Sequence, residues 1–85
     1  MQGEARRLDG KLRAARRSFE KSLSAARKLG MPYDEALARL DLAALDAPGV
    51  AAREQHLRSA ADLLEQLGCR LDLERARRML LGASR

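Results

Sequence analysis

Apolar residues recur at alternating three- and four-residue intervals along two stretches of the chain, the spacing that places them on one face of an α-helix. The pattern predicts long helices over 11–29 and 50–67. The first stripe consists of Leu12, Ala15, Phe19, Ser22, Ala26 and Leu29, and the second of Val50, Arg53, Leu57, Ala60, Leu64 and Leu67. Ser22 and Arg53 are the polar exceptions. A second apolar set broadens the buried surface predicted for 50–67: Ala52, Ala61 and Leu63.

Glycine and proline mark where the long helices stop and the next ones begin. Gly30 and Gly68 follow the two long stripes, and glycine tolerates the left-handed conformation that often closes a helix. Pro32 suits the first turn of a medium helix that should run to about Asp46. The buried stripe of that helix is predicted to be Tyr33, Ala36, Leu37, Leu40, Ala44 and Leu45.

Shorter helices are expected at the two ends of the chain. Asp9-Gly10 predicts the end of a helix over 2–9, because Gly10 can adopt a cap conformation. Asp72 can cap a last helix that stops near Gly82. The predicted order is therefore short, long, medium, long and short, and the short connections force neighbouring helices to be antiparallel.

The two halves of the chain repeat each other when Leu29 is aligned with Leu67, an alignment that we call the internal repeat. Identical residues recur: Leu29, Gly30, Asp34, Ala38, Arg39 and Leu42 become Leu67, Gly68, Asp72, Ala76, Arg77 and Leu80. Apolar positions also align: Leu12 with Val50, Phe19 with Leu57, Ala26 with Leu64, and Tyr33 with Leu71. This pattern indicates a repeated helical hairpin, and stacked hairpins mostly bind other proteins.

The composition favours an all-α fold built as one domain over 1–85. The chain holds one Val, no Ile and no Thr, whereas strands are rich in these residues. Leucine supplies bulk and many alanines allow close helix packing. The lone Cys69 cannot form an internal disulfide, so a reducing cytoplasm fits best. The sequence has no apolar run long enough to cross a bilayer and no secretory signal, so no membrane role is expected.

The residue types that carry catalysis do not form a recognisable constellation. His56 lacks a nucleophile and an orienting acid at matched spacing, and a structural role is the stronger interpretation. Cys69 could be a reactive thiol beside Arg70, but an inert loop cysteine is favoured because the chain has no resolving cysteine. One histidine and one cysteine cannot build a zinc site. We therefore expect no enzyme activity, no cofactor and no metal.

Positive charge is concentrated in the first part of the chain. Residues 1–30 hold nine Lys or Arg against three acids. The candidate basic face comprises Arg13, Arg16, Arg17, Arg27 and Lys28. Such a stripe can neutralise phosphates, so a small basic nucleic-acid-binding protein is an alternative function. A solvated helix face is favoured over it, because no exposed aromatic residue is available for base stacking.

Two stretches resemble tetratricopeptide (TPR) repeats, in particular the divergent type found in the C-terminal regions of large bacterial signalling and regulatory proteins. The stretches are ARKLGMPYDEALARL over 26–40, and AREQHL over 52–57 with LEQLG over 64–68. On that resemblance Gly10 occupies the turn between paired helices, and Pro32 the inter-repeat position. The positions Ala15, Phe19 and Ser22 match a small, large, small pattern. The resemblance implies a protein-binding scaffold of about two repeats plus a closing helix, without intrinsic activity.

Two sets of residues are candidates for contacts with a protein or peptide partner. The concave side suggests a partner site made of Tyr33, Leu37, Arg39, Leu40 and Asp41. The stripe spacing gives Tyr33, Leu37 and Leu40 an alternative role in the core. A short stack leaves its ends uncovered, which suggests self-association through Leu71, Leu73, Met79, Leu80 and Leu81. The chain is therefore expected to be either the tail of a longer protein or a unit that forms a homodimer.

Overall fold

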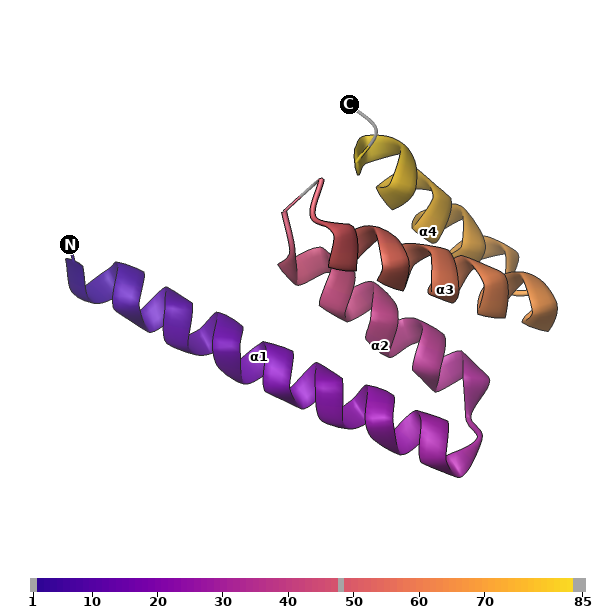
Figure 1. Ribbon diagram of the computed structural model, residues 1–85, viewed down its shortest axis with the longest axis horizontal. Coiled ribbons are helices and arrows are strands. Elements are labelled where there is room, and N and C mark those ends of the chain that lie inside the picture. The colour runs from indigo at the N-terminus through magenta and orange to yellow at the C-terminus, as the bar shows by residue number, and fades with distance from the viewer. Residues whose placement is uncertain (1, 48, 84–85) are drawn as a thin grey trace.

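The computed structural model contains four helices and, within residues 2–47 and 49–83, no strand (Figure 1). They are α1 (Gln2–Leu29), α2 (Pro32–Leu45), α3 (Ala51–Leu67) and α4 (Arg70–Ala83). The structure describes the backbone of these two ranges and the side chains of residues 10–47 and 49–81. The predicted all-α fold of antiparallel helical hairpins is confirmed.

Each helix packs mainly on the helices that precede and follow it in the chain. The hairpin α1–α2 stacks on the hairpin α3–α4 through α2 and α3, and the four helices form an open zigzag (Figure 1). One side-chain contact reaches across the stack, since the hydroxyl of Tyr33 in α2 donates to Asp72 Oδ2 in α4 at 2.8 Å. Stacked helical repeats share this neighbour-by-neighbour packing.

The turns of the two hairpins have the same backbone geometry. The glycines that follow α1 and α3 have φ of 65° and 73°, values that favour glycine because it has no Cβ. The N–H of Met31 donates to the Ala26 carbonyl at 2.9 Å, and the equivalent bond from Cys69 to Leu64 measures 3.0 Å. These bonds satisfy carbonyls that a helix end leaves open. The internal repeat is thus confirmed at both turns.

Two predicted helix boundaries are wrong. α1 is continuous from Gln2, so no helix ends at Gly10 and the chain has four described helices rather than five. Gly10 lacks a positive φ, and a single glycine inside a helix costs only about 1 kcal/mol, which neighbouring helix formers can absorb. Likewise α4 begins at Arg70, so Asp72 lies in its first turn instead of capping it. The Asp72 carboxylate accepts from Tyr33.

Replacing Gly10 by alanine is expected to stabilise the protein by about 0.5–1 kcal/mol, because alanine loses less backbone entropy in a helix. A Cβ at this position would meet no atom within 4 Å. Thermal unfolding followed by circular dichroism measures the gain. The control is Gly30→Ala, which should destabilise because φ is 65° there. A stability loss in the Gly10 variant would contradict the continuous helix.

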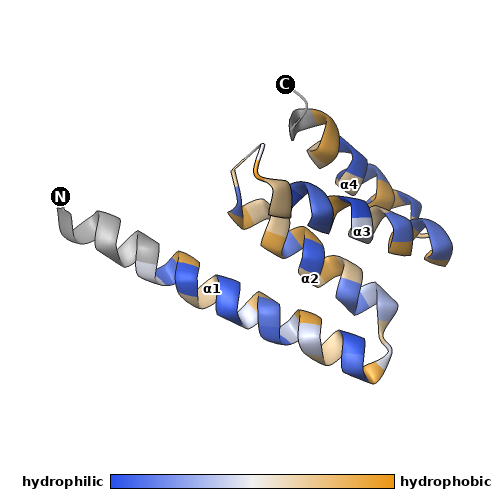
Figure 2. Cartoon of the chain, in the orientation of Figure 1, coloured by the Kyte–Doolittle hydropathy of each residue, from blue (hydrophilic) through white to orange (hydrophobic). Residues whose placement is uncertain are grey.

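The core lies between α2 and α3 and is closed by α4. It consists of Ala36, Leu40, Ala43, Leu57, Ala60, Leu64 and Ala76, all fully buried. Partly buried side chains pack around it: Leu37, Ala61, Leu63, Cys69, Leu73, Met79 and Leu80. The alternation of apolar and hydrophilic faces along the helices is visible in Figure 2. The central part of the stripe predicted for 50–67 is confirmed as core.

The stripe predicted for α2 is correct in its centre and wrong at its edges. Ala44 is exposed and Ala43 is buried instead, and Tyr33 keeps 42% of its surface exposed. Ala38 and Leu42 are buried although neither was predicted to be. The reason is that α2 packs against α1 on one side and α3 on the other. A helix between two neighbours buries two faces.

The ends of the two long stripes are exposed, contrary to the prediction. In α1, Leu12 and Leu29 are 43% and 72% exposed, and Ser22 is exposed as well. Val50 and Leu67 of the second stripe, with 40% and 42% exposed, also lie outside the core. Ala52, from the second apolar set, is exposed too. These side chains lie at the ends of their helices or, like Ser22, on a helix face that no neighbouring helix covers among the described residues.

Candidate protein-interaction surface

A hollow of about 410 Å³ lies between α1 and α2 on the open side of the stack. We call it the α1–α2 hollow. Its lining is mostly apolar and includes two acids: Phe19, Ser22, Ala25, Ala26, Leu29, Met31, Asp34, Leu37, Ala38 and Asp41. Concave, largely apolar surfaces with few polar groups are typical of binding sites.

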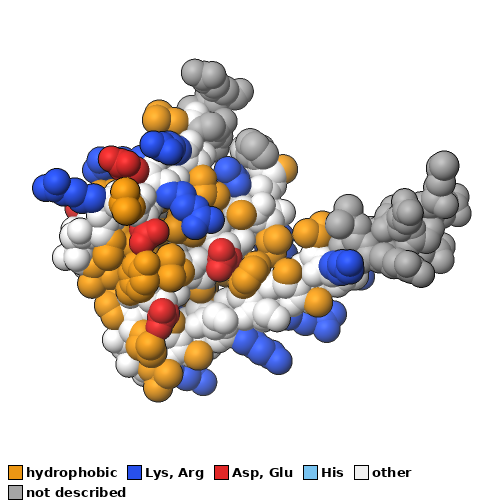
Figure 3. All heavy atoms as spheres, turned by 180° about the vertical axis from the view of Figure 1, so that it is seen from behind, with side chains coloured by type: hydrophobic (Ala, Val, Ile, Leu, Met, Phe, Trp, Pro, Cys, Tyr) orange, Lys and Arg blue, Asp and Glu red, His pale blue; other side chains and the backbone are white. Residues whose placement is uncertain are grey.

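The two carboxylates of the hollow have no cationic partner among the described side chains. Asp34 and Asp41 are two helical turns apart and therefore on the same side of α2. Neither takes part in a described ion pair or hydrogen bond. In the rear view, acidic and basic side chains both lie among apolar ones over the body of the molecule, and further basic side chains follow the edge of the long helix (Figure 3). The hollow therefore presents uncompensated negative charge beside apolar surface.

The internal repeat identifies the groove on the second hairpin, between α3 and α4, that is equivalent to the α1–α2 hollow. In that alignment, Met31 corresponds to Cys69, and Ala38 to Ala76. On the second hairpin these two positions pack into the core with α2. Similarly Asp34 corresponds to Asp72, which accepts a hydrogen bond from the hydroxyl of Tyr33 in α2. The α1–α2 hollow is thus equivalent to the groove of α3 and α4 in which α2 packs.

The five residues predicted as a partner site are not equally accessible. Leu40 is fully buried in the core, so its alternative role is the correct one. Leu37 and Asp41 line the hollow together. Tyr33 is exposed and bonded to α4. Arg39 is partly buried and donates to Glu35 at 3.3 Å, away from the hollow lining.

Sequence reasoning missed most of the hollow. Phe19, Met31 and Asp34 belong to its lining, whereas the stripe spacing predicts only that Phe19 is buried. Ala26, also in the lining, is buried as the stripe predicts. The internal repeat was the signal that could have found them, because it pairs core positions of α3 and α4 with positions of α1 and α2 that line the hollow.

The candidate self-association residues of α4 divide into two groups. Leu73, Met79 and Leu80 pack against the core of the same chain. Leu71 and Leu81 remain 84% and 68% exposed. The apolar surface that α4 offers to a partner is therefore much smaller than the sequence suggested.

Four of the five residues of the candidate basic face are exposed, namely Arg13, Arg17, Arg27 and Lys28. The fifth, Arg16, donates to Asp46 Oδ1 at 2.7 Å, and this bond together with the charge of Asp46 raises the pKa of Arg16.

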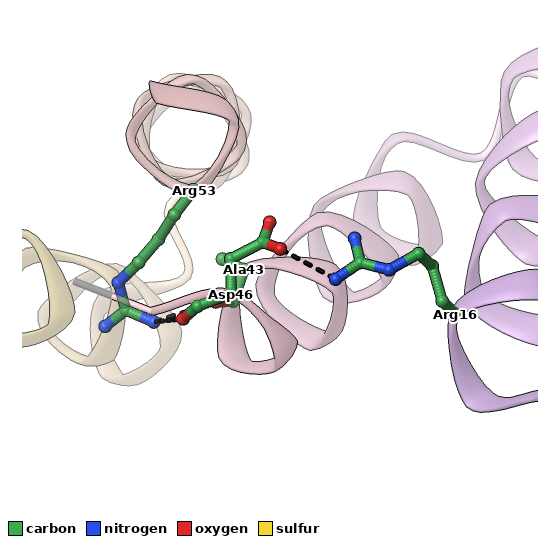
Figure 4. Close-up of polar contacts among 4 residues, drawn as sticks. All are labelled: Arg16, Ala43, Asp46 and Arg53. Atoms are coloured by element: carbon green, nitrogen blue, oxygen red, sulfur yellow. Dashed lines mark hydrogen bonds and ion pairs between the residues drawn. The ribbon is translucent and has the colours of Figure 1, made fainter. Parts of the chain in front are cut away.

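Arginines from two helices meet at the C-terminal end of α2 (Figure 4). Arg16 reaches the Asp46 carboxylate from α1. From α3, Arg53 donates to the Ala43 carbonyl at 2.7 Å and to the Asp46 carbonyl at 3.3 Å. A cation at the C-terminal end of a helix satisfies open carbonyls and opposes the negative end of the helix dipole. Arg53, the polar residue in the apolar stripe of 50–67, therefore has a structural role at the end of α2.

His56 is a partly buried side chain beside Arg39, whose guanidinium lies 3.4 Å from Nδ1 of the histidine. Burial, followed by the charge of Arg39, lowers the pKa of His56 below its ordinary value of 6.5. The neutral ring is thus favoured in the folded chain. Among the described side chains, the polar contact of the ring is the one with Arg39.

The pKa of His56 predicts a loss of stability in mild acid. Below about pH 6.5 the unfolded chain binds a proton on this ring before the folded chain does, so acid favours unfolding. The melting temperature should therefore fall between pH 7.5 and 5.5. His56→Gln should flatten this dependence in the same series of melts. An identical slope in both proteins would contradict the assignment.

The described residues offer no other arrangement typical of chemistry. Cys69 packs against the core, and no group of three or more His, Cys, Asp or Glu within the described ranges could hold a metal ion. Over the same ranges, no helix has both the length and the apolar character to cross a membrane. Comparison of the chain with protein-family models, curated proteins and solved structures gives no match.

Proposed function

We propose that this chain is a protein-binding scaffold of tetratricopeptide type, which recognises a helical segment in the α1–α2 hollow and has no catalytic activity of its own. The observation that carries the proposal is the equivalence of the hollow with the groove that α2 fills on the second hairpin. A surface shaped to pack one helix is suited to receive another. The resemblance further suggests a regulatory role in a bacterial, cytoplasmic signalling protein.

The lining of the hollow defines the chemistry of the ligand. Phe19 and Leu37 offer apolar contacts to side chains on one face of a helix. Asp34 and Asp41, which have no cationic partner among the described side chains, can accept hydrogen bonds from cations at its edge. The partner is therefore an amphipathic helix with apolar anchors and flanking lysine or arginine, a recognition mode common among protein interaction modules.

A pair of synthetic helices tests this proposal. Both carry leucine at alternating three- and four-residue intervals, but one has lysine and the other glutamate at the flanking positions. Fluorescence anisotropy should show saturable binding of the lysine helix alone. Asp34→Lys with Asp41→Lys should weaken that binding by about tenfold or more, because two rim contacts of up to about 1 kcal/mol each become repulsive.

The matched control changes two exposed acids of α3, Asp62→Lys with Glu65→Lys, which alters net charge equally without touching the hollow. Ser22→Trp, which fills the hollow without changing charge, should also block binding. Equal weakening by the control pair would overturn the proposal, as would binding insensitive to Ser22→Trp. Tight binding of duplex DNA that Arg17→Glu weakens would point to the alternative of a nucleic-acid-binding protein.

A further inference from the structure

We infer that the helix received by the α1–α2 hollow is the first half of α1 from a second copy of this chain, in a symmetric dimer whose two α1 helices run antiparallel. This inference rests on the proposed function and names its partner. Each copy gives one helix end and receives the other, so the contact is self-complementary and closes after two chains.

The first half of α1 extends past the helix on which it should pack. α1 has 28 residues and α2 has 14, which correspond to lengths of about 42 and 21 Å at the rise of an α-helix. The bond between Arg16 and Asp46 lies where α2 ends alongside α1. Residues 2–15, which we call the arm, project away from the other helices (Figure 1).

The arm is a helix that gains little from its own chain. Residues 10–14 are all exposed, and Leu12 keeps 43% of its surface in contact with solvent. A solitary helix shorter than about 12–15 residues is only marginally stable in water. Packing against a second helix would supply the tertiary contacts that the arm lacks.

One apolar stripe serves both as the face of the arm and as the wall of the hollow. Leu12 and Ala15 continue at helical spacing into Phe19 and Ala26, which line the hollow. In the sequence, Leu8 extends the same spacing in the other direction. When two α1 helices lie antiparallel, the stripe of each arm meets the hollow of the other copy. Leu29 and Met31, 72% and 44% exposed at the hollow, would then be covered.

Charge favours pairing of the arm with the hollow over pairing of the two arms with each other. Lys11 and Arg13 stand on either side of Leu12, while Asp34 and Asp41 line the hollow without cationic partners among the described side chains. Pairing arm with hollow brings opposite charges together. Pairing two arms with each other would instead bring two basic surfaces together, which is unfavourable. The structure therefore favours a second copy whose arm reaches the hollow.

The packing of α2 on the second hairpin indicates where along α1 an incoming helix would end. α2 runs antiparallel to α3 in the groove of α3 and α4, with its C-terminal end at Arg53. The equivalent of Arg53 in the internal repeat is Ala15. A helix from the second copy that packs antiparallel to α1 would therefore have its C-terminal end near Ala15 of the first copy. At this residue the arm of the first copy begins to extend past α2. The two arms can thus meet their hollows at the same time.

A charge exchange between two variants tests the dimer. The hollow variant carries Asp34→Lys and Asp41→Lys, and the arm variant carries Lys11→Glu and Arg13→Glu. Sedimentation velocity over a dilution series should show that wild type dimerises and that each variant alone raises the dissociation constant at least about tenfold. Mixing the two variants should restore the dimer, because both contacts then join opposite charges. All four substitutions in one chain should restore it as well.

The control variant carries Arg17→Glu and Lys21→Glu, exposed residues on the side of α1 opposite Leu12, and should dimerise like wild type. Circular dichroism verifies that each variant keeps its helical content. A wild type that stays monomeric but binds the lysine helix in the hollow would overturn the dimer and leave the proposed function intact. A monomer that does not bind that helix would overturn both. Equal loss of dimer in control and test variants would overturn the proposed contact.

Discussion

Leu57→Ala is expected to lower the free energy of unfolding by about 2–5 kcal/mol, the usual cost of a cavity left by a buried leucine. Leu57 is fully buried in the core shared by α2 and α3. Domains are generally stable by only about 5–15 kcal/mol, and a chain of 85 residues has a small core. Urea unfolding monitored by circular dichroism measures the loss.

The control for this prediction is Leu71→Ala, which removes the same atoms from a side chain that is 84% exposed. Its effect should stay within about 0.5 kcal/mol, because the site is already in solvent. Similar losses in the two variants would contradict the placement of the core between α2 and α3. The comparison also separates packing from any effect of leucine on helix propensity, since both residues are helical.

Arg53→Met is expected to cost about 1.5–3 kcal/mol, the range for hydrogen bonds that involve a charged group. The change keeps an apolar stem but removes the guanidinium that donates to the carbonyls of Ala43 and Asp46, of which the Ala43 carbonyl keeps the N–H of Asp46 at 3.1 Å. It also removes a cation from the negative end of the α2 dipole. Urea unfolding gives the total loss, and amide hydrogen exchange should show faster opening in the last turn of α2.

The matched variant for Arg53 is Arg58→Met, further along α3. Arg58 pairs with Glu54 at the surface and its side chain is 72% exposed, so its loss should cost no more than about 0.5 kcal/mol. Arg53→Lys should recover part of the stability by keeping the charge. If the two methionine variants were equally stable, the role of Arg53 at the end of α2 would be wrong.

The local sequence predicted the helices and the turns because their signals lie within a few residues of one another. The spacing of apolar residues gave the centres of α2 and α3, and glycine placed the turns at Gly30 and Gly68. Gly10 failed as a stop because a glycine permits a left-handed conformation without imposing it. Whether a helix ends there depends on whether its continuation remains favourable.

The candidate site was only partly predictable, because it is defined by which helices meet. Leu37 and Asp41 belong to the α1–α2 hollow, as a surface contact of α2 would require. Leu40 is removed from any such surface because α3 covers it. The contribution of Phe19 could not be seen in the stripe alone, since the same spacing serves a core and an open groove equally well.

The sequence by itself determined an all-α chain, the positions of its main helices, and a hairpin that occurs twice. These features follow from local propensity, helical periodicity and glycine conformation, which act over short distances. Tertiary structure alone decided which apolar residues became core, why Arg53 lies in an apolar stripe, and where the α1–α2 hollow opens. The physical reason is that burial depends on a neighbouring helix, and α1 has a neighbour along only half of its length.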